Sequence, residues 1–370
     1  MILRSRVVAA LAAASLVLGG CATVDPVPTV PGSAAPGPAP SAELAASLTR
    51  SLAERDAAAF ADCFAPTTTA QRVAALWYAN LTLFESASFT ATGGTLTLAW
   101  TVPGDRAPLV QPVPARLGDW DGRELVLDLS ADPAPDWAVA PVVVDTSKAG
   151  SVILGADRPT DARRRFARAL DDAAATLAAT DLGSLGSAWN QRLVLDVVRD
   201  ASAYAAAGGR PDVDAAVTSC AGEAVRIVVN PVASGFEADE LGPLVLHEGV
   251  HAETRACDAA YPRWVIEGLA ESVTAAAYPA VASANRETAT EWVAAHGLPD
   301  ALPDDFGQDD AASQRAVYAL AQLAVDATVA HLGRADAADL LATFGQPDTK
   351  QADVARVTGW YVAALRGLVP

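Results

Sequence analysis

Two histidines and a glutamate stand together in the segment His247-Glu248-Gly249-Val250-His251, and Glu267 follows sixteen residues after the second histidine. Residues four apart share one face of a helix, so both imidazoles can reach one ion. Glu248 would lie about 100° round the helix, beside the coordination position left open for water. With Glu267 as the third ligand, these residue types and this spacing predict a zinc site that activates water for hydrolysis.

Histidine is rare in this chain, with 4 among 370 residues, so an accidental H-E-x-x-H is improbable. The alternative interpretation is a helix that carries two polar histidines on its surface. The downstream segment at residues 264–271 argues against that alternative, because it places a glutamate where a third ligand is needed.

The segments HEGVH (residues 247–251) and WVIEGLAE (residues 264–271) resemble the gluzincin metallopeptidases, over roughly residues 160–370. The resemblance implies that His247, His251 and Glu267 bind zinc, that Glu248 is the general base, and that Glu271 supports a ligating histidine. Glu271 also follows Glu267 by four residues, so it shares its helix face and could accept a hydrogen bond from an imidazole. The alternative for Glu271 is a solvated surface glutamate.

Peptide hydrolysis also needs a group that stabilises the developing oxyanion. The candidates are Tyr318, Tyr278, Arg255 and His331. We rank Tyr318 first, because it lies on a long predicted helix that faces the cleft. The alternative for Tyr318 is an aromatic side chain in the core.

The first twenty residues carry Arg4 and Arg6, then an apolar run at residues 7–18, then Leu18-Gly19-Gly20-Cys21. This order is typical of a signal peptide and resembles a bacterial lipoprotein signal, which implies cleavage before Cys21 and a lipid on its sulfur. The alternative, a permanent transmembrane anchor, is disfavoured because the apolar run is too short to span a bilayer. We therefore expect the protein on the extracytoplasmic face of the membrane, held by lipid.

Residues 21–42 are expected to be a tether, since six prolines fall between residues 22 and 42 and favour an extended chain. The formal net charge is −18, and the loss of Arg4 and Arg6 with residues 1–20 would make it −20. Such an acidic chain is a poor electrostatic partner for nucleic acid or for an anionic membrane surface. The expected partners are a peptide or protein substrate and, through Cys21, the membrane.

With Cys21 assigned to lipid, three cysteines remain, at positions 63, 220 and 257. In the gluzincin fold, the strand after Cys220 and the zinc helix that Cys257 follows pack together. The resemblance thus suggests a disulfide between Cys220 and Cys257. The alternative is a pair of buried thiols, which pack as small apolar groups.

The first half of the mature chain, residues 43–156, reads as a small α+β domain. A helix is expected over residues 41–62, followed by short strands at residues 81–89, 95–102, 125–129 and 137–144. Helices against one curved antiparallel sheet resemble the cone-shaped folds of the nuclear transport factor 2 type. This half contains no histidine, so we expect no catalysis there.

The second half, residues 157–370, is expected to be the metallopeptidase domain, with a helix over residues 161–180 and strands at 192–198 and 224–230. In gluzincins an edge strand upstream of the zinc helix pairs with extended substrate. Residues 224–230 occupy the place that corresponds to this edge strand, although they could equally be an ordinary core strand.

The zinc helix is expected to begin near residues 240–243 and to end before Pro262. Gly249 would allow close packing, and Gly268 would let the helix that carries Glu267 approach the zinc helix. Helices at residues 287–296, 314–331, 335–344 and 353–368 would form a C-terminal lobe, with His296 and His331 capping two of them.

The expected fold class is therefore α+β: a thermolysin-like zincin domain with a helical C-terminal lobe, preceded by a small domain of helices and antiparallel strands. The expected function is that of a lipid-anchored, extracytoplasmic zinc metallopeptidase with one catalytic zinc ion. The alternative is a surface binding lipoprotein without catalysis on the same scaffold.

Overall fold

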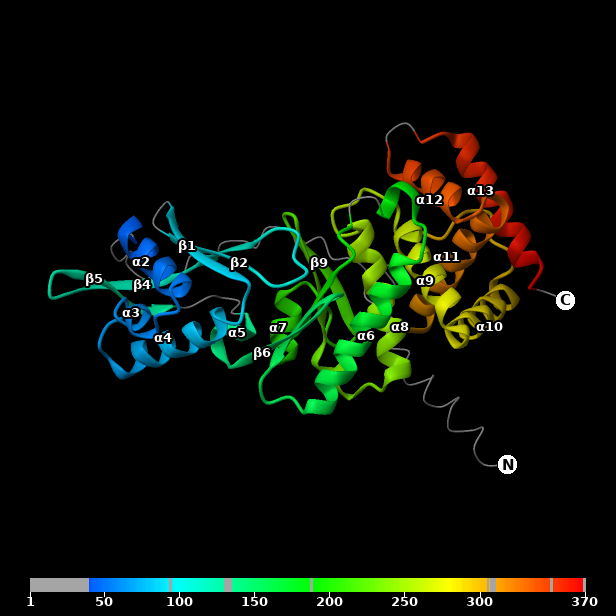
Figure 1. Cartoon of the computed structure of the whole chain (residues 1–370). Coiled ribbons are helices and arrows are strands. Elements are labelled where there is room, and N and C mark those ends of the chain that lie inside the picture. Colours follow the sequence, from blue (N-terminus) through cyan, green and yellow to red (C-terminus); the bar gives the residue numbers. More distant parts are fainter. Residues whose placement is uncertain are drawn as a thin grey trace, which may run out of the picture.

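The computed structural model has a small N-terminal unit at one end, a central sheet, and a lobe of helices at the other end (Figure 1). It describes residues 40–368, apart from residues 93–94, 130–134, 187–188, 305, 307–310 and 347–348. The expected signal peptide, Cys21 and the tether up to residue 39 lie outside the described residues. Within the described part of the chain, no helix is long and apolar enough to cross a membrane.

The N-terminal unit begins with three helices, α2 (Ala42–Ala53), α3 (Ala57–Ala61) and α4 (Thr68–Leu81). The single helix expected over residues 41–62 is therefore wrong, because the chain turns between α2 and α3 with Arg55 at φ 55°. Leu44, Leu48 and Leu52 do form the buried face of α2. Helix α4 was not predicted from the sequence, although its buried Trp77 and Leu81 lie one turn apart.

The strands of this unit form two antiparallel sheets rather than the one curved sheet expected. The first contains β1 (Ser86–Thr92), β2 (Thr95–Thr101) and β3 (Leu109–Val113), and the second contains β4 (Ala115–Trp120) and β5 (Arg123–Leu129). The expected strand at residues 137–144 begins instead as a helical turn, α5 (Asp136–Val139). Asn80 holds that turn, because its Nδ2 donates to the Trp137 and Ala140 carbonyl oxygens, at 2.6 and 2.8 Å.

The central sheet has five strands in the order β6, β7, β8, β10, β9. Their bounds are Val142–Ser147, Gly150–Gly155, Leu193–Val197, Ala224–Val229 and Ala216–Ala221, respectively. Strands β7 and β8 are parallel, which joins the β6–β7 hairpin to the second half of the chain. The predicted domain boundary at residue 156 is thus misplaced, since β6 and β7 belong to the central sheet.

Successive residues of a strand face opposite sides of a sheet, and the two sides of the central sheet belong to different cores. Val152, Leu154 and Leu193 pack into the core shared with the helices, while Ile153 and Val194 pack into the core of the N-terminal unit. The N-terminal unit thus covers one face of the sheet. On the other face lie α6 (Thr160–Ala178) and α8 (Ala238–Thr254).

The C-terminal lobe confirms a mixed α+β chain with a helical C-terminal region. It contains α9 (Arg263–Ala277), α10 (Pro279–His296), α11 (Ala311–Leu332), α12 (Arg334–Ala342) and α13 (Gln351–Arg366). Short elements complete the described chain, namely α7 (Ala201–Ala206), η1 (Gly183–Gly186), η2 (Pro231–Gly235) and η3 (Thr343–Gly345). Helix α9 lies between α8 and α11, so a side chain on α9 can contact both neighbours.

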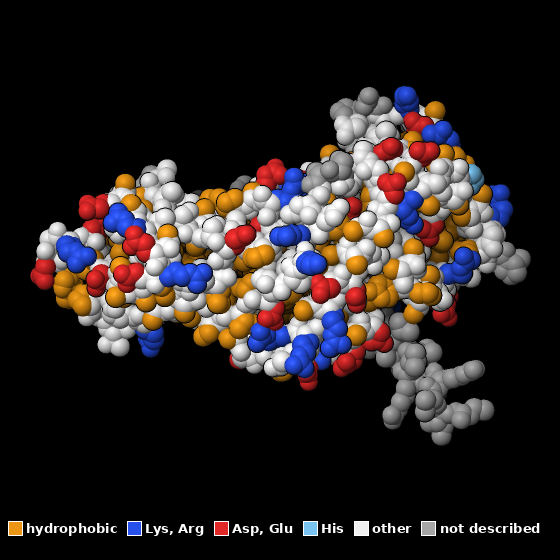
Figure 2. All heavy atoms as spheres, viewed as in Figure 1, with side chains coloured by type: hydrophobic (Ala, Val, Ile, Leu, Met, Phe, Trp, Pro, Cys, Tyr) orange, Lys and Arg blue, Asp and Glu red, His pale blue; other side chains and the backbone are white. Residues whose placement is uncertain are grey.

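On the face shown in Figure 2, acidic and basic side chains are interspersed along the whole molecule. The net negative charge is therefore not gathered into one acidic patch on this face. Such mixed charge gives no electrostatic reason for this face to bind a strongly charged polymer.

Candidate metal centre

Helix α8 carries both histidines. The backbone N–H of Glu237, which precedes the helix, donates to the Glu240 carboxylate at 2.9 Å, a contact that helps to fix the first turn. The helix begins at Ala238, slightly earlier than expected, so Pro243 lies in its second turn. His247 and His251 lie one turn apart and are completely buried, with their Nε2 atoms 3.0 Å apart.

Helix α9 supplies the third residue of the cluster. Oε2 of Glu267 lies 3.4 Å from Nε2 of His247 and 3.3 Å from Nε2 of His251. A tetrahedral zinc ion with bonds of about 2.0 to 2.1 Å keeps its donor atoms about 3.3 Å apart. The three buried residues therefore form a group that could hold a metal ion of this size.

The charges in the cluster favour an added cation. Burial lowers the pKa of His247, but Glu267 and Glu271 outweigh that effect and raise it to about 10. Burial raises the pKa of Glu267, yet His251 and His247 dominate and lower it to about 2. Among the described residues, neither carboxylate oxygen of Glu267 has a hydrogen-bond partner. A metal ion could replace the proton on His247 as the positive charge in the cluster and would give the Glu267 carboxylate a ligand bond.

Glu271 lies behind His247, as its spacing from Glu267 indicated. Its Oε1 is 3.2 Å from Nδ1 of His247, on the side of the ring away from Glu267. It is buried, so the alternative of a solvated surface glutamate is wrong.

Glu248 is completely buried beside the two histidines. Its Oε2 accepts a 2.7 Å hydrogen bond from the Thr218 hydroxyl on β9, whereas its Oε1 has no hydrogen-bond partner in the described part of the chain. Burial raises the pKa of Glu248, although His251, His247 and the Thr218 hydrogen bond lower it. The carboxylate is thus held through one oxygen and leaves the other available.

Thr218 was not predicted from the sequence, and neither was the place of its strand. β9 lies at the end of the strand order, while β10 lies between β8 and β9. Residues 224–230 are therefore the ordinary core strand, and β9 is the edge strand nearest the cluster. No sequence signal marks Thr218, because its contact with Glu248 joins residues 30 positions apart.

Tyr318 on α11 lies beside the cluster, with its ring centroid 6.3 Å from that of His247. Its hydroxyl is buried and has no hydrogen-bond partner among the residues that the structure describes. Burial raises its pKa, so the phenol stays protonated and can donate. The ring packs in the core, as the alternative interpretation had it, and the residue lies next to the cluster.

Arg263 is a second residue that sequence reasoning missed. It lies one turn before Glu267 on α9, and its guanidinium is 3.6 Å from Oε1 of Glu267. The side chain is 45% exposed, so it links the buried cluster to solvent. The i−4 spacing from Glu267 could have suggested it.

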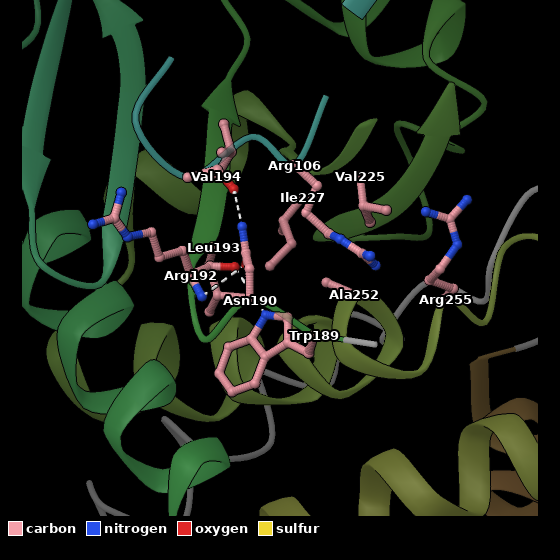
Figure 3. A pocket seen from close by; sticks show the side chains of 11 residues that line it. Arg106, Trp189, Asn190, Arg192, Leu193, Val194, Val225, Ile227, Ala252 and Arg255 are labelled. Carbon is pink, nitrogen blue, oxygen red and sulfur yellow. Dashed lines mark hydrogen bonds between the residues drawn. The ribbon is translucent and has the colours of Figure 1, made fainter. Parts of the chain in front are cut away.

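The other oxyanion candidates do not contact the cluster. Arg255 donates to the Gly222 carbonyl and pairs with Glu223 and Asp258. Figure 3 shows it at the rim of a separate pocket, across from Arg106. The ring of His331 stacks on Trp360, and its Nδ1 lies 2.8 Å from a carbonyl of its own helix, which agrees with a role at the helix end.

Tyr278, the remaining candidate, lies at the far end of α9 as its C-terminal cap. Its hydroxyl packs against Gly242 in the second turn of α8, where an added Cβ would lie only 2.5 Å from the hydroxyl oxygen. His296, the other predicted cap, has its Nδ1 3.0 Å from the Trp292 carbonyl oxygen. Tyr278 and His296 therefore have contacts outside the cluster.

Cys220 and Cys257 form a disulfide, with their Cα atoms 5.8 Å apart. The bond joins the end of β9 to the segment just after α8. It therefore ties the strand that carries Thr218 to the helix that carries Glu248. Cys63 is a buried free thiol in the N-terminal unit.

Comparisons with protein-family models, with curated proteins and with solved structures found no match to this chain. Its function is therefore inferred from the residues of the site.

Proposed function

We propose that this protein is a zinc metallopeptidase of the gluzincin type, built on a thermolysin-like arrangement of helices beside a sheet. The observation that carries the proposal is the buried cluster of His247, His251 and Glu267, with Glu248 beside it. A site that only stores metal needs no such carboxylate next to its ligands, and buried carboxylates are costly unless they have a use.

In this proposal His247 and His251 would hold zinc through Nε2, and Glu267 would hold it through Oε2. A bound zinc supplies a Lewis acid for the substrate carbonyl and a water of lowered pKa. Glu248 accepts the proton of the attacking water at Oε1, while Thr218 holds Oε2. The same carboxyl then donates that proton to the amine that leaves.

Tyr318 is the proposed donor to the oxyanion that develops on the substrate carbonyl. Its hydroxyl has no other partner among the described residues, and its ring lies beside His247. Tyr318→Phe should lower kcat by roughly 10²-fold or more and leave the zinc content unchanged. An unchanged kcat would remove Tyr318 from the mechanism.

The location is also part of the proposal. The lipoprotein signal at residues 1–21 would place the protein outside the cytoplasm, held by lipid on Cys21. The disulfide between Cys220 and Cys257 supports such a location, because stable disulfides are typical of oxidising compartments.

The test is hydrolysis of a mixed peptide library by the zinc-loaded protein and by two variants. Glu248→Gln should keep its zinc and lose about 10²-fold to 10⁴-fold in rate, because the base is lost. His251→Ala should lose zinc and activity together. If Glu248→Gln cleaves as fast as the wild type, the proposed base is wrong. Zinc binding without cleavage would favour the alternative of a binding lipoprotein.

A further inference from the structure

A chain of polar side chains extends behind His247 through the helical lobe. Asn285 on α10 donates through Nδ2 to Oε2 of Glu271 on α9 and to Oε1 of Gln322 on α11, both at 2.7 Å. Gln322 donates to Asp326 at 3.0 Å, and Asp326 accepts from Ser272 on α9 at 2.6 Å. The chain thus starts and ends on α9, after passing through α10 and α11.

The direction of these hydrogen bonds is fixed by chemistry. Glu271 and Asp326, as carboxylates, can only accept. Asn285 must therefore present its NH₂ group to Glu271, and both protons of that group are used, one for Glu271 and one for Gln322. Gln322 accepts at one end of its amide and donates at the other, and Ser272 donates to Asp326, so all four hydrogen bonds have a matched donor and acceptor.

Glu271 connects this chain to the metal cluster. Its Oε2 is held by Asn285, while its Oε1 lies 3.2 Å from Nδ1 of His247. A carboxylate at that distance favours a proton on Nδ1, so that Nε2, on the side of Glu267 and His251, would be the nitrogen left for a metal ion. If Glu271 turned away, the ring would lose this constraint.

We propose that Asn285 and Gln322 are positioning residues for the metal site: they hold Glu271 against His247, so the affinity for zinc depends on α10 and α11. The inference rests on the proposed zinc site and extends it to two helices that carry no ligand. A network that merely joins helices would affect stability and leave the zinc affinity unchanged.

The experiment is a competition titration of zinc between a fluorescent chelator and the full chain in detergent, at one pH. Asn285→Leu and Gln322→Met replace each amide with an apolar side chain of similar size. Asn285→Leu should weaken zinc binding about tenfold or more, as loss of a partner of a ligating histidine usually does. Gln322→Met should weaken it in the same direction.

The control is Thr328→Val, also on α11. Thr328 is buried, but its hydroxyl donates to the Ala324 carbonyl of its own helix and takes no part in the chain. It should leave the zinc affinity within twofold. Because Asn285 and Gln322 act through one path, the double variant should weaken binding by less than the product of the two single effects.

Melting temperatures in the presence of a chelator report the folding of each metal-free variant. Zinc affinities within twofold of the wild type for both variants, in protein that melts cooperatively, would overturn the inference while leaving the zinc site in place. If Asn285→Leu does not fold, Gln322→Met decides by the same criterion. If the wild type itself binds no zinc, the proposed function fails, and this inference fails with it.

Discussion

The Thr218 hydroxyl lies 2.7 Å from Oε2 of Glu248, and the two residues come from the edge strand β9 and the helix α8. Both groups are buried, so water does not compete with Thr218 for that oxygen. The contact holds the proposed base in one orientation and also favours its ionised form.

Replacement of Thr218 by valine should therefore lower kcat about tenfold while the zinc content stays unchanged, because the carboxylate loses its support. Thr218→Ser keeps a hydroxyl and should retain most of the activity. Steady-state kinetics with zinc analysis checks both variants. Equal rates for the valine and serine variants would show that this hydrogen bond does not serve the base.

Gly268 allows α9 to approach α11, since a Cβ at this position would lie 2.5 Å from the Ala321 carbonyl oxygen. The sequence predicted close packing with the zinc helix here, whereas the helix that Gly268 contacts is α11. Gly268→Ala should lower the free energy of unfolding by about 1 to 3 kcal/mol, because the Ala321 backbone cannot easily move away from the added methyl group. Denaturant titration measures this change.

Gly249→Ala is the matched control. A Cβ there would lie 2.8 Å from Leu177 Cδ1, the tip of a side chain that can move, and alanine favours the helix by about 1 kcal/mol. This variant should be close to neutral in the same titration. If it is as unstable as Gly268→Ala, contact with backbone is not the deciding factor.

The disulfide should leave one free thiol among residues 40–368, that of Cys63. Alkylation of unfolded protein without reductant should add one group to this part of the chain, and three after reduction, as mass spectrometry of its peptides can count. The double variant Cys220→Ala/Cys257→Ala should lose roughly 3 to 4 kcal/mol of stability. Three alkyl groups before reduction would contradict the pairing.

Glu253, near the end of α8, should make stability depend on pH. Burial raises its pKa to about 8, and its Oε2 has no hydrogen-bond partner within the described residues. Since the folded state holds this proton more tightly than the unfolded state, the associated stability is fully present below the ordinary pKa of 4.5 and is lost as the pH rises through 8.

Glu253→Gln should therefore raise the melting temperature of the metal-free protein at pH 9, by roughly 2 to 6 °C, and change it much less at pH 6. Thermal unfolding in a chelator at the two pH values measures this. The same shift at both pH values would rule out titration of Glu253 as the cause.

Local patterns were enough to predict the group that could hold a metal ion, and the glutamate beside it. His247, His251, Glu267 and Glu271 lie at helical spacings within two neighbouring helices, so short-range periodicity places them on common faces. The helices of the C-terminal lobe were found for the same reason. The pairing of Cys220 with Cys257 was suggested only by the resemblance to gluzincins, and two buried thiols were an equally good interpretation of the sequence.

The missed features depend on contacts between distant parts of the chain. Thr218 reaches Glu248 across 30 positions, and Asn80 on α4 turns residues 136–139 into helix from 57 to 60 positions away. The sequence did not predict that β6 and β7 lie in the central sheet, because a short hairpin carries no local sign of which sheet it joins. That place depends on the pairing of β7 with β8.

The most direct test of the account is the amount of zinc bound per chain after dialysis, measured by elemental analysis for the wild type, His251→Ala and Glu248→Gln. We expect about one zinc in the wild type and in Glu248→Gln, and almost none in His251→Ala, because only the histidine is a proposed ligand. Zinc absent from the wild type, or retained by His251→Ala, would contradict the assignment of His247, His251 and Glu267 as the metal site.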